Sequence, residues 1–217
     1  IVRLPQARWF VLAMLPSVML LATTNEVCMN IAVVPFLWIV PLTLYLLSFI
    51  LTFESDRFYH RRLMVIVTAI SLFLTTLFLQ RDTMSGVLLQ IVVYFANLFA
   101  VCMLCHGELV RLKPNPRYLT MFYLTMSAGG AAGGLAVGLL APLMFDGYFE
   151  LPLAIVACLL ICLGTFLDDH KRFQQLFSRT AIQRFAMTLL GLCFVYYLTF
   201  AQRSANVLDA MRNFYGV

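Results

Sequence analysis

Long apolar stretches alternate with short polar segments along the 217-residue chain. A helix needs about 20 apolar residues to cross a bilayer, within a range of roughly 17 to 25. The pattern therefore predicts an all-α integral membrane protein: a bundle of about seven transmembrane helices over residues 1–201, with 202–217 as a tail or linker. The seven stretches are 9–24, 34–53, 63–79, 86–105, 118–143, 151–167 and 183–201.

Prolines and glycines mark places where these helices should depart from a straight course. Pro16 lies in the first stretch, while Pro35 and Pro41 lie in the second, so we expect kinks in both. The fifth stretch is long enough to tilt, or to bend at its glycines.

The composition agrees with a membrane protein. Hydrophobic residues make up 62% of the chain and charged residues 12%, against roughly 25% charged in an average soluble domain. The formal net charge of +5 is spread between the apolar stretches, which indicates membrane topology and no nucleic-acid partner. The expected partners are the lipid bilayer and neighbouring helices, of this chain or of another subunit.

Lysine and arginine alternate between the connecting segments. From the N-terminus to the segment after the sixth stretch, their counts are 2, 0, 3, 1, 3, 0 and 4. The positive-inside rule then places the N-terminus in the cytoplasm and, with seven helices, the C-terminus outside it, in a bacterial cytoplasmic (inner) membrane. The two arginines of the C-terminal tail count against that last assignment. No signal peptide precedes the first stretch, so we expect an internal or processed segment.

Cys102, Cys105 and His106 have the C-x-x-C-H spacing of c-type haem attachment. They end the fourth stretch beside a basic loop, which the charge pattern places in the cytoplasm, whereas covalent haem attachment takes place on the other side of the membrane. We therefore do not expect haem here, and interpret both cysteines as small buried residues of a helix face.

The loop expected after the fourth stretch begins with the phrase CHGELVRLKPNPR. It contains the candidate functional residues His106, Glu108 and Arg111. On a continuing helix His106 and Glu108 would diverge by about 200° and could not share a metal, although a turn at Gly107 would change this. The phrase is either an ion-paired hinge or docking site, or an ordinary solvated loop, and we favour the loop because basic residues are common at cytoplasmic helix ends.

Glycines recur at four-residue spacing in the fifth stretch. Side chains this small let two helices approach closely, so the spacing predicts tight helix packing rather than a dinucleotide site. The glycines are Gly129, Gly130, Gly133, Gly134 and Gly138. In the fourth stretch, Asn97 is expected to hydrogen-bond a neighbouring helix.

Candidate chemistry is sparse elsewhere. Acidic residues fall at the ends of the stretches, so the paired ionisable groups of an ion-coupled transporter are missing from the membrane centre. The run from Asp168 to His170 looks like a metal-ligand cluster, but the neighbouring Lys171 and Arg172 favour a solvated face. We predict no metal site and no catalytic residue in this segment.

Three parts of the chain carry a resemblance to a known family. They are 8–24 with 34–53, then 105–134 with 141–154, and the final phrase RNFYGV at 212–217. Together they resemble the membrane half of bacterial multi-pass proteins fused to a spermidine-synthase-like domain. In that family a Rossmann-like aminopropyltransferase domain follows a phrase like RNFYGV, and the chain ends at Val217, before the glycine-rich loop that such a domain uses.

The resemblance implies a role for the segment but no catalytic residue. The complete protein would transfer an aminopropyl group from decarboxylated S-adenosylmethionine to a polyamine-like amine, while this segment anchors it in the membrane, with a conduit or sensor role open. The His106–Glu108 phrase and the Gly129–Gly134 cluster correspond to recurrent features of the membrane half. Two alternatives stay open: an accessory subunit of a larger membrane complex and, ranked below it, a small-molecule transporter that uses the proline-bearing helices.

Overall fold

The structure is a computed structural model, and it describes residues 6–31, 36–55, 59–80, 86–144 and 150–172. The chain divides into two units, Ile1–Cys162 and Leu163–Val217. All the functional candidates with described side chains belong to the first unit. In the second, the structure describes only the end of one helix, as far as Arg172.

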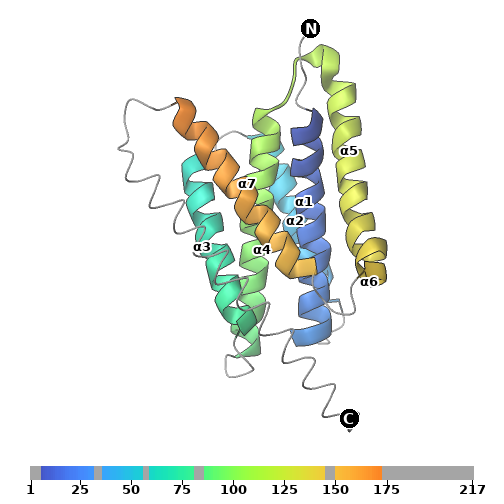
Figure 1. Cartoon of the computed structure of the whole chain (residues 1–217), viewed down its shortest axis with the longest axis vertical. Helices are drawn as coiled ribbons and strands as arrows, with labels where there is room; N and C mark the ends of the chain where they lie inside the picture. The colour runs from blue at the N-terminus through green and yellow to red at the C-terminus, as the bar shows by residue number, and fades with distance from the viewer. Residues whose placement is uncertain (1–5, 32–35, 56–58, 81–85, 145–149, 173–217) are drawn as a thin grey trace. The chain divides into compact units, whose positions relative to one another are not determined.

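Every regular element in the described part of the chain is helical (Figure 1). Two helices continue into a π-helical turn, which is a rare local widening of the helix. The elements are α1 (Gln6–Asn25) with the π turn Glu26–Ile31, α2 (Ile39–Glu54), α3 (Arg61–Gln80), α4 (Val87–Arg111), the 3-10 turn Pro116–Tyr118, α5 (Leu119–Leu135) with the π turn Ala136–Leu140, α6 (Ala141–Met144) and α7 (Glu150–Arg172).

Four helical spans among the described residues are long and apolar enough to cross a membrane: Gln6–Cys28, Arg61–Phe78, Val87–Arg111 and Pro116–Leu143. Two further apolar helices, Ile39–Glu54 and Glu150–Cys162, are shorter. The all-helical class is therefore confirmed, but the count of seven spanning helices is not. The stretch predicted at 183–201 lies outside the described residues.

The second apolar stretch forms a shorter helix than the sequence pattern predicts, for a local reason. Phe36 has a positive φ of 64°, and α2 starts only at Ile39. Pro41 therefore lies in the first turn, where its missing N–H is not needed for a helical hydrogen bond. The expected kink inside this helix is wrong at Pro41, because the helix begins just before it.

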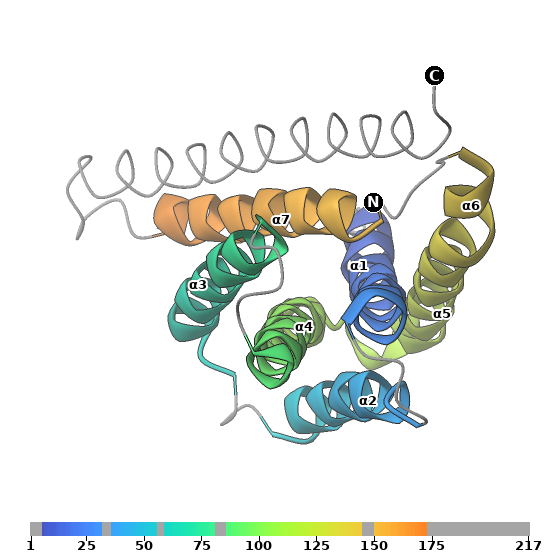
Figure 2. The same cartoon turned by 90° about the horizontal axis from the view of Figure 1, so that it is seen from below.

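Helix α4 lies among three others, with α1, α2 and α3 packed against it (Figure 2). Polar groups join it to α3: Thr68 Oγ1 donates to the Ala100 carbonyl at 3.1 Å, and Ser71 Oγ donates to Asn97 Oδ1 at 3.0 Å. The expected hydrogen bond of Asn97 to a neighbouring helix is thus confirmed. In an apolar environment such bonds hold helices in register.

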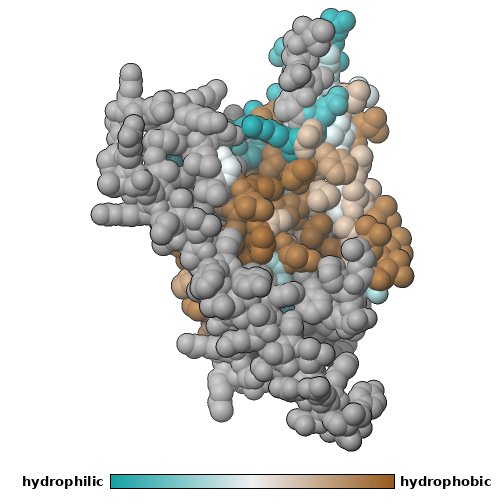
Figure 3. Space-filling model, viewed as in Figure 1, coloured by the Kyte–Doolittle hydropathy of each residue, from teal (hydrophilic) through white to brown (hydrophobic). Residues whose placement is uncertain are grey.

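Polar side chains are buried in this unit, whereas large apolar ones cover much of its surface. Asn97 is 0% exposed and His106 1%, yet Leu88 is 76% exposed and Leu124 65%. Figure 3 shows hydrophobic residues over the middle of the described helices, with hydrophilic residues mostly at the end where α4 stops and α5 begins. The other buried polar or charged residues are Thr23, Glu26, Ser48, Thr52, Thr68, Thr75, Thr76 and Glu108.

Two of the glycines on α5 let this helix lie directly against α1. A Cβ atom on Gly129 would collide with the Phe10 carbonyl, and one on Gly133 would lie 2.5 Å from the Met14 carbonyl oxygen. Gly130 faces Ser17 at an ordinary contact distance, whereas Gly134 and Gly138 face open space. The close packing therefore uses one face of α5, and its partner is a helix of the same chain.

Gly133→Ala should destabilise the bundle, whereas Gly134→Ala should not. The added methyl group on Gly133 meets a backbone carbonyl that cannot move aside, and overpacking of this kind costs about 1–3 kcal/mol. At Gly134 the methyl group meets nothing within 4 Å and raises helix propensity. Thermal unfolding of the purified variants in one detergent measures the difference, and equal unfolding temperatures would contradict the proposed contact.

Candidate functional site

The candidate residues lie in a helix and not in a loop, and two of the three are buried. Helix α4 continues through Gly107 to Arg111, and every residue from Ala100 to Leu109 is buried. The expected solvated loop is therefore wrong at His106 and Glu108, whereas Arg111 is helical but keeps a side chain that is 40% exposed. Neighbouring helices surround this part of α4, and packing against them keeps the chain helical through Gly107.

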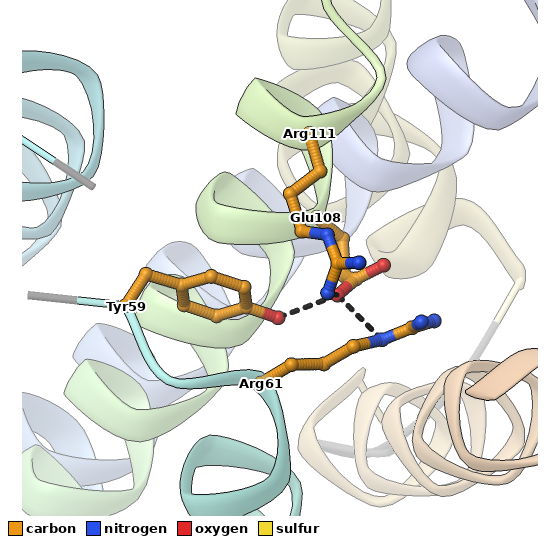
Figure 4. A network of polar contacts seen from close by, with 4 residues as sticks. All are labelled: Tyr59, Arg61, Glu108 and Arg111. Carbon is orange, nitrogen blue, oxygen red and sulfur yellow. Dashed lines mark hydrogen bonds and ion pairs between the residues drawn. The ribbon is translucent and has the colours of Figure 1, made fainter. Parts of the chain in front are cut away.

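Glu108 is the centre of a polar cluster at the end of α4 (Figure 4). Its Oε1 atom accepts a hydrogen bond from the Tyr59 hydroxyl at 2.6 Å and lies 2.9 Å from Arg61 Nε, at the start of α3. Arg111 Nη1, on the next turn of α4, is 3.8 Å from the same oxygen. The Glu108 and Arg61 side chains are only 9% and 13% exposed, so their ion pair is poorly screened by solvent.

Gly107 brings the Tyr59 ring into this cluster. A Cβ atom at this position would collide with the ring, so the ring packs directly on the helix backbone. Burial first, and then the Glu108 carboxylate, raise the pKa of the Tyr59 phenol above its usual range, against the opposing effect of Arg61 and Arg111. Tyr59 therefore stays protonated and acts as a hydrogen-bond donor.

The cluster lies at one basic end of the bundle. All the lysines and arginines that the structure describes in the first unit are found where α1, α3 and α5 begin and where α4 ends (Figure 1). Trp9 fixes this end: its Nε1 donates to the Leu112 carbonyl at 3.1 Å, and its ring packs edge-on against Phe122 at 5.2 Å. The basic residues are Arg8, Arg61, Arg62, Arg111, Lys113 and Arg117.

His106 faces α2, away from the Glu108 cluster. Its Nδ1 lies 3.0 Å from Ser48 Oγ, and the rings of Tyr45 and Phe49 pack edge-on against the imidazole at 5.2 and 5.3 Å. The two sides of the phrase thus join α4 to different helices. A metal shared by His106 and Glu108 is incompatible with this geometry, as expected for a continuous helix.

A pocket of about 430 Å³ lies beside the polar cluster. Arg111 contributes to it with a side chain that is 40% exposed. Because this guanidinium makes only one long contact with Glu108, the pocket has a positively charged wall. Its lining residues are Thr52, Tyr59, Gly107, Val110 and Arg111.

The other chemistry-bearing motifs are distributed differently. Cys102 and Cys105 of the haem-like motif are buried in α4, at 0% and 1% exposure, so neither thiol is presented at a surface. The described residues contain no group of three or more potential metal ligands. The run from Asp168 to His170 lies in the last turns of α7, outside the residues whose side chains the structure describes.

Three partners of the candidate residues do not follow from sequence reasoning. Tyr59 and Ser48 carry no local signal, because each acts through a contact with a residue about 50 positions away. Arg61 is visible in the sequence as a basic residue at a helix start. Only its position across the helix pair from Glu108 makes it part of a site.

Comparison of the chain with models of protein families, with curated proteins and with solved structures gave no match.

Glu108→Gln should destabilise the protein much more than the same change at the exposed Glu54. Removal of one partner of a buried ion pair leaves the other charge unpaired, at a cost of about 3–5 kcal/mol, whereas an exposed substitution changes stability by about 0.5 kcal/mol or less. Thermal and denaturant unfolding in detergent measure both variants. The cluster is not structural if Glu108→Gln and Glu54→Gln behave alike.

Tyr59→Phe tests the hydrogen bond through its dependence on pH. The variant keeps the ring on Gly107 but loses a donor to a carboxylate, and should be less stable than the parent by about 1.5–3 kcal/mol near neutral pH. Because the folded pKa is raised, the contribution of Tyr59 is fully present below its unfolded pKa of about 10 and declines above that pH. The stability gap between parent and variant should therefore narrow between pH 10 and 11, and a constant gap would contradict the assignment.

Proposed function

We infer that this segment is a membrane-embedded helical domain that anchors a larger protein in a bacterial cytoplasmic membrane. One observation carries the proposal: the bundle buries amides, hydroxyls and a charge cluster while exposing leucine, isoleucine and valine. Water-soluble domains bury apolar side chains and rarely expose large continuous apolar patches. A bilayer is the environment in which this distribution is favourable.

The basic end of the bundle supports an orientation with that end in the cytoplasm. Positively charged residues near helix ends favour the cytoplasmic side, and all six described basic residues of the first unit lie at this end. The N-terminus of α1, the start of α3 and the loop from Leu112 to Asn115 would then face the cytoplasm. The opposite end, with the start of α4 at Val87, would face outward.

The resemblance to spermidine-synthase-like fusion proteins supports the next step of the proposal. The attached domain would follow Val217 and transfer an aminopropyl group from decarboxylated S-adenosylmethionine to an amine. The described residues would serve as its anchor and supply no reacting group. Reading the coding sequence beyond Val217 tests this step: about 200–300 further residues with a nucleotide-binding glycine loop support it, and a stop codon there would disprove it.

A second candidate is an accessory subunit of a membrane complex. It is favoured by Gly134 and Gly138, which face open space on the outer side of α5. A helix from another subunit could approach this side closely. Recovery of a stoichiometric partner after mild detergent extraction, and its loss in Gly138→Leu, would favour this candidate over the anchor.

Labelling with a membrane-impermeant maleimide tests the anchor and its orientation together. Lys113→Cys and Gly86→Cys lie beyond opposite ends of the 25-residue α4, which is about 37 Å long at 1.5 Å per residue. In spheroplasts only the Gly86→Cys variant should react, and in inverted vesicles only the Lys113→Cys variant. Both variants should remain with the membranes after an alkaline wash.

The parent protein is the control: its described thiols in α4 and α7 are buried, and any labelling at the part-exposed Cys28 is measured there and subtracted from both variants. Reaction of both engineered thiols from the same side would overturn the spanning arrangement. Release of the protein by the alkaline wash would overturn the anchor itself.

A further inference from the structure

A second pocket, of about 180 Å³, lies between α1, α2, α4 and α5 on the side of α4 opposite the Glu108 cluster. His106 lines it, together with the aromatic rings of Tyr45 and Phe49. Ser127, which is exposed, lies at its margin, so the pocket reaches the outer surface of the bundle. Its remaining lining residues are Ala13, Leu109, Met126 and Gly130.

The contacts around His106 favour one assignment of its ring proton. Ser48 Oγ lies 2.7 Å from the Tyr45 carbonyl oxygen, and a carbonyl can only accept, so the single hydroxyl proton of Ser48 is used there. The contact of 3.0 Å between Ser48 Oγ and His106 Nδ1 is then a hydrogen bond only if Nδ1–H donates. In a neutral imidazole the other nitrogen, Nε2, is then an acceptor.

His106 lines the pocket, and Nε2 is its ring nitrogen that does not contact Ser48. The described residues give this atom no hydrogen bond, although His106 is only 1% exposed. Nε2 is not one of the fully buried polar side-chain atoms that lack a hydrogen bond in the described residues, so it keeps some contact with open space. The open space that His106 lines is this pocket.

We propose that the pocket binds a neutral single-ring compound whose hydroxyl group donates a hydrogen bond to His106 Nε2. The acceptor requires a donor on the ligand, and the absence of a charged residue among the pocket-lining residues requires a neutral one. The volume suits one ring, since an apolar cavity of about 150 Å³ holds benzene. Tyr45 and Phe49 provide aromatic edges and faces against which such a ring packs.

Phenol and anisole form the matched pair of probes. They share one ring, but anisole carries a methyl ether in place of the hydroxyl donor. With protein selectively ¹⁵N-labelled at histidine in lipid nanodiscs, the Nε2 resonance of His106 should be that of an unprotonated nitrogen. Phenol should shift this resonance in a saturable way. Its affinity should be about tenfold higher than that of anisole, because anisole cannot donate the hydrogen bond to Nε2.

Gly130→Val and Gly134→Val separate binding in the pocket from partition into the lipid. A Cβ atom on Gly130 would lie 3.5 Å from Ser17 Oγ, which is an ordinary contact, and Gly130 lines the pocket, so we expect a valine side chain there to fill it. A Cβ atom on Gly134 would meet nothing within 4 Å. Phenol binding should be lost in Gly130→Val and retained in Gly134→Val. His106→Gln, compared with the parent, identifies the His106 resonance among those of the three histidines.

Two sources could supply the hydroxyl-bearing ring, and a second arm distinguishes them. A long-chain alkylphenol in the nanodisc lipids presents the ring from the bilayer, and phenol presents it from water. A shift with either probe that Gly130→Val abolishes supports the site and names the source. A protonated Nε2 in the parent, an equal response to phenol and anisole, or a response unchanged in Gly130→Val would overturn the proposal.

Discussion

The burial of α4 on all sides between Ala100 and Leu109 is the constraint on which this structure depends. A helix that is surrounded in this way has no face on which a polar side chain can be solvated. A polar group buried there is stabilised by a partner on another helix, because an unmatched one costs about 1–3 kcal/mol. The contacts of His106 with α2 and of Glu108 with α3 follow from this requirement.

Gly107 lies between these two contact residues of the helix and leaves room for a third contact. Residues two positions apart on a helix point about 200° apart, so His106 and Glu108 diverge toward different helices while the glycine between them admits the Tyr59 ring. The three residues of this phrase thus join α4 to α2, to the segment before α3 and to the start of α3. Gly129 and Gly133 serve in the same way on α5, where they admit the α1 backbone.

The sequence predicted features that depend on local pattern, and it missed those that depend on contact across the bundle. The helical class, the glycine spacing and the role of Asn97 all follow from side-chain size and hydropathy along one stretch. The end of α4 did not, because Gly107 and the charged residues after it look like a loop. Tertiary packing outweighs that local signal, since Leu109 is fully buried and Glu108 is paired with Arg61. The start of α2 depends on a positive φ at Phe36, which a single sequence does not reveal.

The polar groups of α4 become more strongly charged toward its C-terminal end, an order that suits the proposed placement of this helix across a bilayer. Asn97, a neutral amide, lies near the middle of the helix. His106, bonded through a neutral hydroxyl, lies nine residues or about 13 Å further along at 1.5 Å per residue. Glu108 is charged and paired, and Arg111, about 4.5 Å beyond it, is 40% exposed. The cost of burying a charge falls as the site approaches the interface, so a paired carboxylate is tolerated where the arginine beside it reaches water. The same order places His106, which lines the second pocket, beside the uncharged side chains of Ser48, Tyr45 and Phe49 and apart from the Glu108 ion pair.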